Sequence, residues 1–293
     1  MGYVFALLSV FSFGLSNCLW VKPLAYWSVW QVMAWLSFMS TLLFTLLLLV
    51  SLYGNVITIP YGVTYKSIGL YTYATTALFC AYSYFGLVFY NLALKQKIEV
   101  SITVPVTCSS AFWGLCTAYI AYNDVIDKSK FSILLLFMLG VFLIDKQNTA
   151  KQLKLSRGIA YALVAAFIWG TSFALFPIFI KDTGVGLFSL ILESTVCVCS
   201  ISIVFITKGH RQLVNPSAKQ LVSIVPIAVC GFLGVLFFNI ATQYIAMSSL
   251  ILLDLLTPIV SVVISGLLLH EKLTIKQYTA ITIILIAVLL IKL

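Results

Sequence analysis

Ten long apolar runs divide the sequence, and they restrict the possible folds more than any other feature. Short connections between the runs hold most of the charged residues. About twenty apolar residues cross the hydrocarbon core of a bilayer as a helix, and only a helix satisfies all its backbone hydrogen bonds within one segment. The runs cover residues 2–21, 29–52, 67–93, 99–121, 128–144, 158–180, 186–206, 220–245, 248–269 and 275–291. The sequence therefore predicts an all-α integral membrane protein with ten transmembrane helices.

The composition excludes a soluble domain. Of 293 residues, 62% are hydrophobic and 9% are charged, whereas a soluble domain is about half apolar and a quarter charged. The net charge of +9 does not indicate a nucleic-acid partner, because the Lys and Arg residues lie in short clusters between apolar runs, as in membrane proteins. We expect a multi-pass protein of the cell membrane whose first run, residues 2–21, is a mature span and not a signal peptide, since no basic segment precedes it.

The two halves of the chain repeat each other. The segment MGYVFALLSVFSFGLS (1–16) matches RGIAYALVAAFIWGTS (157–172), and GLVFYNLA (86–93) matches GVLFFNIA (234–241). The blocks occur in the same order, which indicates duplication. Five spans per copy is an odd number, so the second copy enters the membrane from the opposite side, a plan that is common among secondary transporters. We predict two inverted five-helix repeats, residues 1–146 and 158–293, with a linker at 147–157.

The end of the second half resembles the close of an EamA repeat, in the drug/metabolite transporter superfamily. The resemblance rests on a Pro-containing run, the turn His270-Glu271-Lys272 and a final run, together with Trp169-Gly170 in the first helix of this half. It implies ten helices in two inverted repeats and a transport function, with amino-acid export as the leading substrate class. The first half departs from the pattern, because Ser110 and Asn123 stand where the second half has Pro258 and Glu271.

Two acids lie inside apolar runs and are the main candidates for chemistry. Asp254 precedes Pro258 by four residues, and Glu193 lies about seven residues into its run. An unpaired charge at mid-membrane costs roughly 2.5–3.5 kcal/mol on insertion scales, so such residues are usually functional. We expect Asp254 to carry a coupling proton, because Pro258 can open the helix to water and burial favours the neutral acid. Glu193 could instead reach water at a helix end or bind a cationic substrate group.

Polar and aromatic side chains complete the predicted substrate site. Asn91 and Asn239 occupy matched positions in the two halves, and burying an amide in lipid without partners is unfavourable. Ile98-Glu99-Val100 resembles the segment after the third helix in aromatic amino-acid exporters of the superfamily, and by that resemblance Tyr82 and Trp169 would line the cavity. The predicted substrate-binding residues are Asn17, Trp20, Tyr82, Asn91, Thr107, Trp169, Glu193, Asn239 and Asp254.

The residues predict a secondary transporter that works by alternating access and is driven by a proton gradient. The resemblance implies export of amino acids or related small polar metabolites. An exporter of organic cations or drugs is the alternative, because the buried charges are acidic. An intramembrane enzyme or a membrane receptor is the rival outside this class, but no His-Glu-x-x-His motif, phosphate loop or nucleophile elbow is present. We expect no cofactor, no bound metal and a monomer.

The orientation in the membrane has two conflicting predictions. If residue 1 starts on one side, the connections on that side hold 5 Lys and Arg residues and those on the other side hold 12, which together make the 17 in the chain. The positive-inside rule then puts both termini outside the cell. The family resemblance implies that both termini lie in the cytoplasm.

Overall fold

The computed structural model describes most of the predicted spans. The described residues are 1–25, 27–53, 69–96, 100–107, 109–124, 128, 130–136, 157–206 and 218–268, with residues 275, 278, 279, 282, 283 and 286. Glu99, Glu271 and nearly all of the predicted linker lie outside this set, and so does most of the fifth and tenth runs. Arg157, which we placed in the linker, is the first residue of a helix instead.

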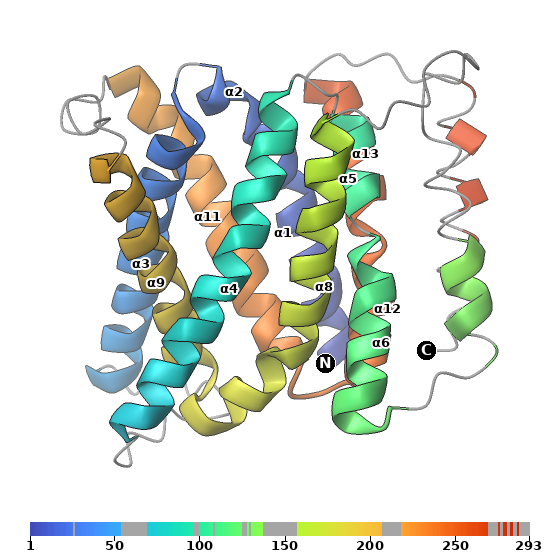
Figure 1. Cartoon of the computed structure of the whole chain (residues 1–293), viewed down its shortest axis with the longest axis horizontal. Helices are drawn as coiled ribbons and strands as arrows, with labels where there is room; N and C mark the ends of the chain where they lie inside the picture. The colour runs from blue at the N-terminus through green and yellow to red at the C-terminus, as the bar shows by residue number, and fades with distance from the viewer. Residues whose placement is uncertain are drawn as a thin grey trace.

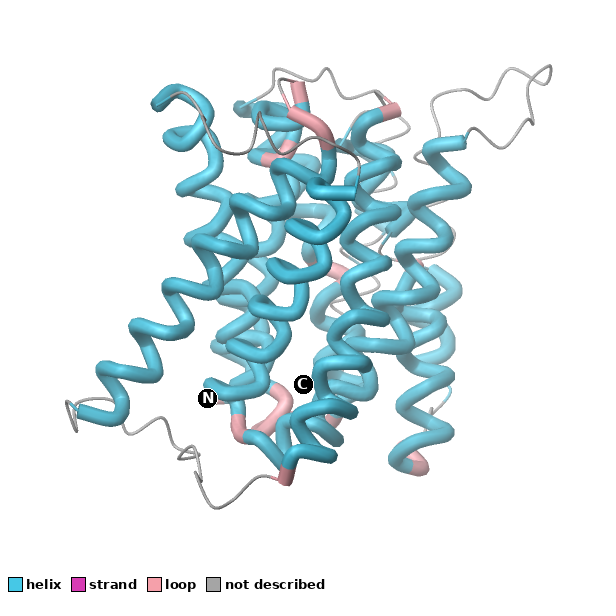
Figure 2. Tube along the Cα trace, turned by 60° about the vertical axis from the view of Figure 1, so that its left-hand side comes forward, coloured by secondary structure: helices cyan, strands magenta, loops and turns pink. Residues whose placement is uncertain are grey.

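The described residues form helices and contain no strand, which confirms the all-α prediction (Figures 1 and 2). Their bounds are α1 Gly2–Leu19, α2 Val21–Leu24, α3 Val29–Tyr53, α4 Leu70–Lys95, α5 Val100–Thr107, α6 Ser110–Tyr122, α8 Arg157–Thr183, α9 Val185–Ile206, α11 Ala218–Ala241, α12 Met247–Asp254 and α13 Thr257–Leu268. Within the described part of the chain, seven segments are long and apolar enough to cross a membrane.

The helices pack as a bundle in which helices of the first half contact helices of the second half. Helix α1 lies against α11 and α13, α8 lies against α4 and α6, and α3 packs on α9. In Figure 1, α1 begins near the lower edge and leads up to α2, whereas α8 runs from the upper edge downward. Helices α3 and α9 also run in opposite directions in this view.

Small residues allow the closest of these contacts. A Cβ atom on Gly14 of α1 would lie 2.5 Å from Cγ1 of Val260 in α13. A Cβ atom on Gly170 of α8 would collide with the backbone oxygen of Ser110 and lie 2.7 Å from Cβ of Trp113, both in α6. Glycine permits such approaches between membrane helices because it has no side chain.

Two of the predicted spans are interrupted near their middle. The run 248–269 divides into α12 and α13, which are separated by a turn at Leu255 and Leu256. The run 99–121 divides into α5 and α6. Pro258 lies in the first turn of α13, where its missing N–H leaves no helical hydrogen bond unmade. The predicted polar face from Asp254 to Ser265 is therefore not one continuous helix, since Asp254 ends α12.

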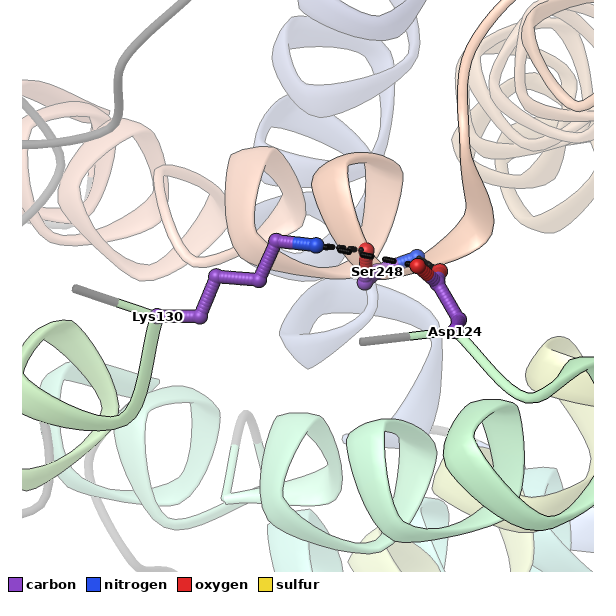
Figure 3. A network of polar contacts seen from close by, with 3 residues as sticks. All are labelled: Asp124, Lys130 and Ser248. Atoms are coloured by element: carbon purple, nitrogen blue, oxygen red, sulfur yellow. Dashed lines mark hydrogen bonds and ion pairs between the residues drawn. The ribbon is translucent and has the colours of Figure 1, made fainter. Parts of the chain in front are cut away.

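A polar network fixes the beginning of α12 to the end of α6 (Figure 3). The Oδ2 atom of Asp124 accepts a hydrogen bond from the backbone N–H of Ser248 at 3.1 Å. The Nζ atom of Lys130 donates to Oγ of Ser248 at 2.7 Å and lies 3.7 Å from Oδ1 of Asp124. A carboxylate at the first turn of a helix compensates its free N–H groups and its positive end. The network therefore fixes the starting end of the helix whose last residue is Asp254.

Candidate functional site

A cavity lies among the helices of both halves. Measured as the space open to the centre of a water molecule, its volume is about 170 Å³. One water needs roughly 10–15 Å³ of such space, so the cavity can hold several waters or a small organic molecule. Its lining comprises Phe13, Ser16, Asn17, Trp20, Leu36, Ser40, Ser83, Tyr84, Leu87, Tyr90, Val104, Thr107, Ser110, Trp169, Phe173, Phe176, Leu192, Glu193, Val196, Gly231, Val235, Phe238, Asn239, Asp254 and Thr257.

Glu193 reaches the cavity from α9, where it is only 8% exposed. Its carboxyl group makes no hydrogen bond or ion pair with any residue that the structure describes. A helix-end carboxylate in contact with bulk water, one of the two sequence interpretations, would be more exposed than this. Because a buried carboxylate without a partner is unfavourable, Glu193 requires either a proton or a bound hydrogen-bond donor.

Asp254 reaches the cavity at the break between α12 and α13. The Oγ1 atom of Thr257 donates to its Oδ1 atom at 2.9 Å. Thr257 is the first residue of α13, so the carboxyl group lies at the positive end of that helix. The sequence prediction that the chain opens near Asp254 agrees with this geometry, although the opening is a turn between two helices and not a bend at Pro258.

Two amides, Asn17 of α1 and Asn239 of α11, line the cavity with different partners. Oδ1 of Asn17 accepts a hydrogen bond from the hydroxyl of Tyr90 at 3.0 Å, and Nδ2 of Asn17 donates to Oγ of Ser261 at 3.4 Å. Nδ2 of Asn239 donates to Oγ of Ser189 at 2.9 Å, and Ser189 itself donates to a backbone carbonyl of α9. Oδ1 of Asn239 is buried and has no hydrogen-bond partner among the described residues. The cavity therefore contains an unfilled acceptor besides Glu193.

Aromatic rings form a large part of the wall. The rings of Tyr90 and Trp169 lie 5.2 Å apart, and Trp169 stacks on Phe173 with centroids 5.9 Å apart and an angle of 12° between planes. Trp20, between α1 and α2, is buried and also faces the cavity. Such rings present negative faces that attract cations.

The structure brings seven of the nine predicted residues to this cavity and leaves two away from it. Tyr82 is half exposed on another face of α4, where its hydroxyl lies 2.7 Å from Oγ1 of Thr171. Asn91 is fully buried, donates from Nδ2 to the carbonyl of Leu87 at 2.8 Å and does not line the cavity. The seven residues at the cavity are Asn17, Trp20, Thr107, Trp169, Glu193, Asn239 and Asp254.

Several lining residues were missed from the sequence. Tyr84 follows Tyr82 by two positions, which turns it to a different side of α4. The spacing of Ser83, Leu87 and Tyr90 by four and three residues marks the face that meets the cavity, and the spacing of Trp169, Phe173 and Phe176 does the same in α8. These helical stripes were visible in the sequence but could not be told from ordinary packing faces.

Comparison with known proteins agrees with this description. Residues 156–293 match the EamA-like transporter family. A protein of known crystal structure has the same fold: the two superpose with a TM-score of 0.72 over 99% of this chain and 97% of that one, at 12% sequence identity. No curated protein is significantly similar in sequence.

A helical bundle around a largely apolar cavity that contains two acids, with seven candidate membrane spans in its described part, defines a multi-pass integral membrane protein. The match of residues 156–293 to the EamA-like transporter family supports a membrane transporter. The resemblance inferred from the sequence is thereby confirmed.

Proposed function

We propose that the protein is a secondary-active transporter that exports amino acids or related small polar metabolites across the cell membrane by alternating access. The observation that carries this proposal is the cavity itself, which holds two acids and lies beside a helix break in a chain that matches a transporter family. Interrupted helices that meet at a buried site are typical of secondary transporters, because they supply polar backbone groups without exposing them to lipid.

The two halves act, in this proposal, as inverted repeats around the cavity. Three pairs of contacts support it. Gly86 packs on the ring of Trp169, and its counterpart Gly234 packs on the ring of Phe13, where a Cβ atom would lie 2.7 Å from ring carbons. The approaches of Gly14 to α13 and of Gly170 to α6 are related in the same way. Helices α3 and α9, second in each half, pack on each other and run in opposite directions (Figure 1).

The same pairing extends to the helix breaks. Aligning Gly86 with Gly234 without gaps puts the α5–α6 interruption opposite the α12–α13 turn. At the aligned position, Val106 stands where the second half has Asp254. The acid is thus specific to one half, which suits a group that couples transport to one ion. We propose that Asp254 takes up and releases the coupling proton, while Glu193 contacts the substrate.

An exporter of organic cations is the second candidate function. The lining of the cavity contains the two acids and no Lys, Arg or His among the residues described. This favours a cationic group on the substrate but does not by itself exclude an amino acid.

Transport into proteoliposomes tests the proposal. Purified protein is reconstituted, a pH gradient is imposed, and uptake of radiolabelled amino acids and amines is compared with that of protein-free liposomes. We expect saturable uptake of at least one compound that collapses when a protonophore is added. Uptake that never exceeds the protein-free background would contradict a transport function.

A further inference from the structure

We infer that the cavity recognises a protonated amine on an aromatic or aliphatic body, and that it selects against compounds that also carry a carboxylate. The inference favours the second candidate function, the export of organic cations, over amino-acid export, and rests on the proposed function only for the claim that a bound molecule is transported. It concerns binding at the cavity, which can be measured by itself.

The charge of the cavity is the first argument. Glu193 and Asp254 come from α9 and α12, and no basic side chain lies opposite them in the described lining. A carboxylate that leaves water for a buried site loses several kcal/mol unless a cation or a full set of donors receives it. An ammonium group, in contrast, is balanced by a carboxylate in this lining and can donate three hydrogen bonds.

The lining contains buried acceptors without a partner in the described part of the chain, which is the second argument. The carboxyl group of Glu193 lacks a partner among the described residues, and so does Oδ1 of Asn239. The orientation of the Asn239 amide is fixed, because the proton of Ser189 Oγ goes to the carbonyl of Val185 and its oxygen must therefore accept from Nδ2. Buried acceptors without partners require a ligand that donates.

The described lining offers a carboxylate only neutral donors, several of which are already engaged, and this is the third argument. The hydroxyl of Tyr90 and Nδ2 of Asn17 donate to protein acceptors. The hydroxyls of Thr107 and Thr257 do likewise, to the carbonyl of Thr103 and to Asp254. The remaining donors are the indole N–H groups of Trp20 and Trp169 and hydroxyls such as those of Ser16 and Tyr84, and none of them carries a charge to balance a carboxylate.

The wall of the cavity selects the rest of the ligand. Trp20, Trp169 and Tyr90 line it together with phenylalanines, and the negative faces of such rings attract a cation. Apolar walls with few polar groups favour a ligand with an apolar body. The ligand class is therefore a monoamine attached to an aromatic or aliphatic group, with the amine near Glu193 and Asn239.

Binding of matched compounds to the purified full-length protein tests the inference. Isothermal titration calorimetry compares 2-phenylethylamine with phenylalanine, which differ by the carboxylate, and with 3-phenylpropionate, which has the carboxylate but no amine. We expect the amine to bind at least tenfold more tightly than phenylalanine and the acid not to bind. Equal or tighter binding of phenylalanine, or no measurable binding of the amine, would overturn the inference.

Two substitutions locate the amine. Glu193→Gln keeps the shape of the side chain and is expected to weaken binding of 2-phenylethylamine at least tenfold, whereas Asp182→Asn, the same change at an exposed acid at the end of α8, should leave it unchanged. Glu193→Asp keeps the charge and should restore part of the affinity, which separates recognition from misfolding. If Glu193→Gln binds the amine as tightly as the unsubstituted protein, the assignment is wrong.

Failure of the proposed transport function and failure of the inference give different experimental results. If the amine binds but labelled amine is not moved in proteoliposomes, the proposed transport function fails while the inference stands. If phenylalanine is both bound more tightly and transported, the transport function stands and the inference fails.

Discussion

Asp254 and Glu193 differ in what their carboxyl groups contact, and this difference separates their expected roles. Asp254 accepts a hydrogen bond from Thr257 at the start of α13, so its charged form has local support. Glu193 has no such support from the described residues and depends on what enters the cavity. A coupling group must change protonation within the cycle, and a substrate contact must be vacant between cycles.

Asp254→Asn should abolish accumulation driven by a pH gradient. The amide keeps the size of the side chain but cannot release a proton, so concentrative uptake in proteoliposomes is expected to fall to the protein-free level. Exchange of labelled for unlabelled substrate without a gradient should remain in part, since it requires no net proton movement. Concentrative uptake with an unchanged dependence on pH would show that this carboxyl group is structural.

Asn239→Leu and Asn91→Leu should have different effects, although the two positions match in the sequence. Asn239 lines the cavity with a free acceptor, so its loss should weaken ligand binding by about three- to tenfold, the worth of one hydrogen bond. Asn91 does not line the cavity, and we expect its replacement to leave the dissociation constant unchanged. Isothermal titration calorimetry on both variants measures the dissociation constants. A larger change for Asn91→Leu than for Asn239→Leu would contradict the placement of the two side chains.

At the scale of elements, the bounds of most helices could be predicted from the sequence because lipid imposes them. The run 29–52 corresponds to α3 Val29–Tyr53 and the run 186–206 to α9 Val185–Ile206. The interruption after Asp254 could not be predicted, because the turn consists of Leu255 and Leu256, which favour a helix. The packing of the surrounding helices and Pro258 override that preference.

The types of residue in the candidate site could be predicted from the sequence. The side of the helix on which each residue lies was predicted less well. Buried acids and amides are costly in lipid, which identified Glu193, Asp254 and Asn239. Tyr82 was chosen by resemblance, and the structure turns it away from the cavity, while Tyr84 lines it. The helices that pack around a given helix decide which of its sides faces inward. The sequence alone does not show which helices these are.

The polar network of Asp124, Lys130 and Ser248 acts at the scale of elements, because it fixes the beginning of α12. Asp124→Ala removes the acceptor of the Ser248 N–H group at the start of α12, and loss of a helix cap costs about 0.5–2 kcal/mol. We expect a lower midpoint of thermal unfolding in detergent, with Asp182→Ala as a control that leaves it unchanged. A midpoint identical to that of the unsubstituted protein would show that the network in Figure 3 does not stabilise α12.

At the scale of the whole molecule, contacts between the halves hold the bundle together. A Cβ atom at Gly170 would collide with the backbone of Ser110, which cannot move as easily as a side chain. Gly170→Ala should therefore lower stability by about 1–3 kcal/mol, the usual cost of overpacking. Gly231→Ala is the matched control, because nothing lies within 4 Å of its Cβ position. Thermal unfolding of the two variants should differ clearly, and equal midpoints would contradict the close contact.

The whole molecule is expected to move a small metabolite that carries an amino group across the membrane. The most direct measurement is uptake of a radiolabelled amine or amino acid by proteoliposomes under an imposed pH gradient, corrected for protein-free liposomes with the same gradient. We expect saturable uptake of the labelled compound above the equilibrium level, and we expect an excess of unlabelled 2-phenylethylamine to inhibit it. Uptake no greater than that of protein-free liposomes for every amine and amino acid tested would contradict this expectation.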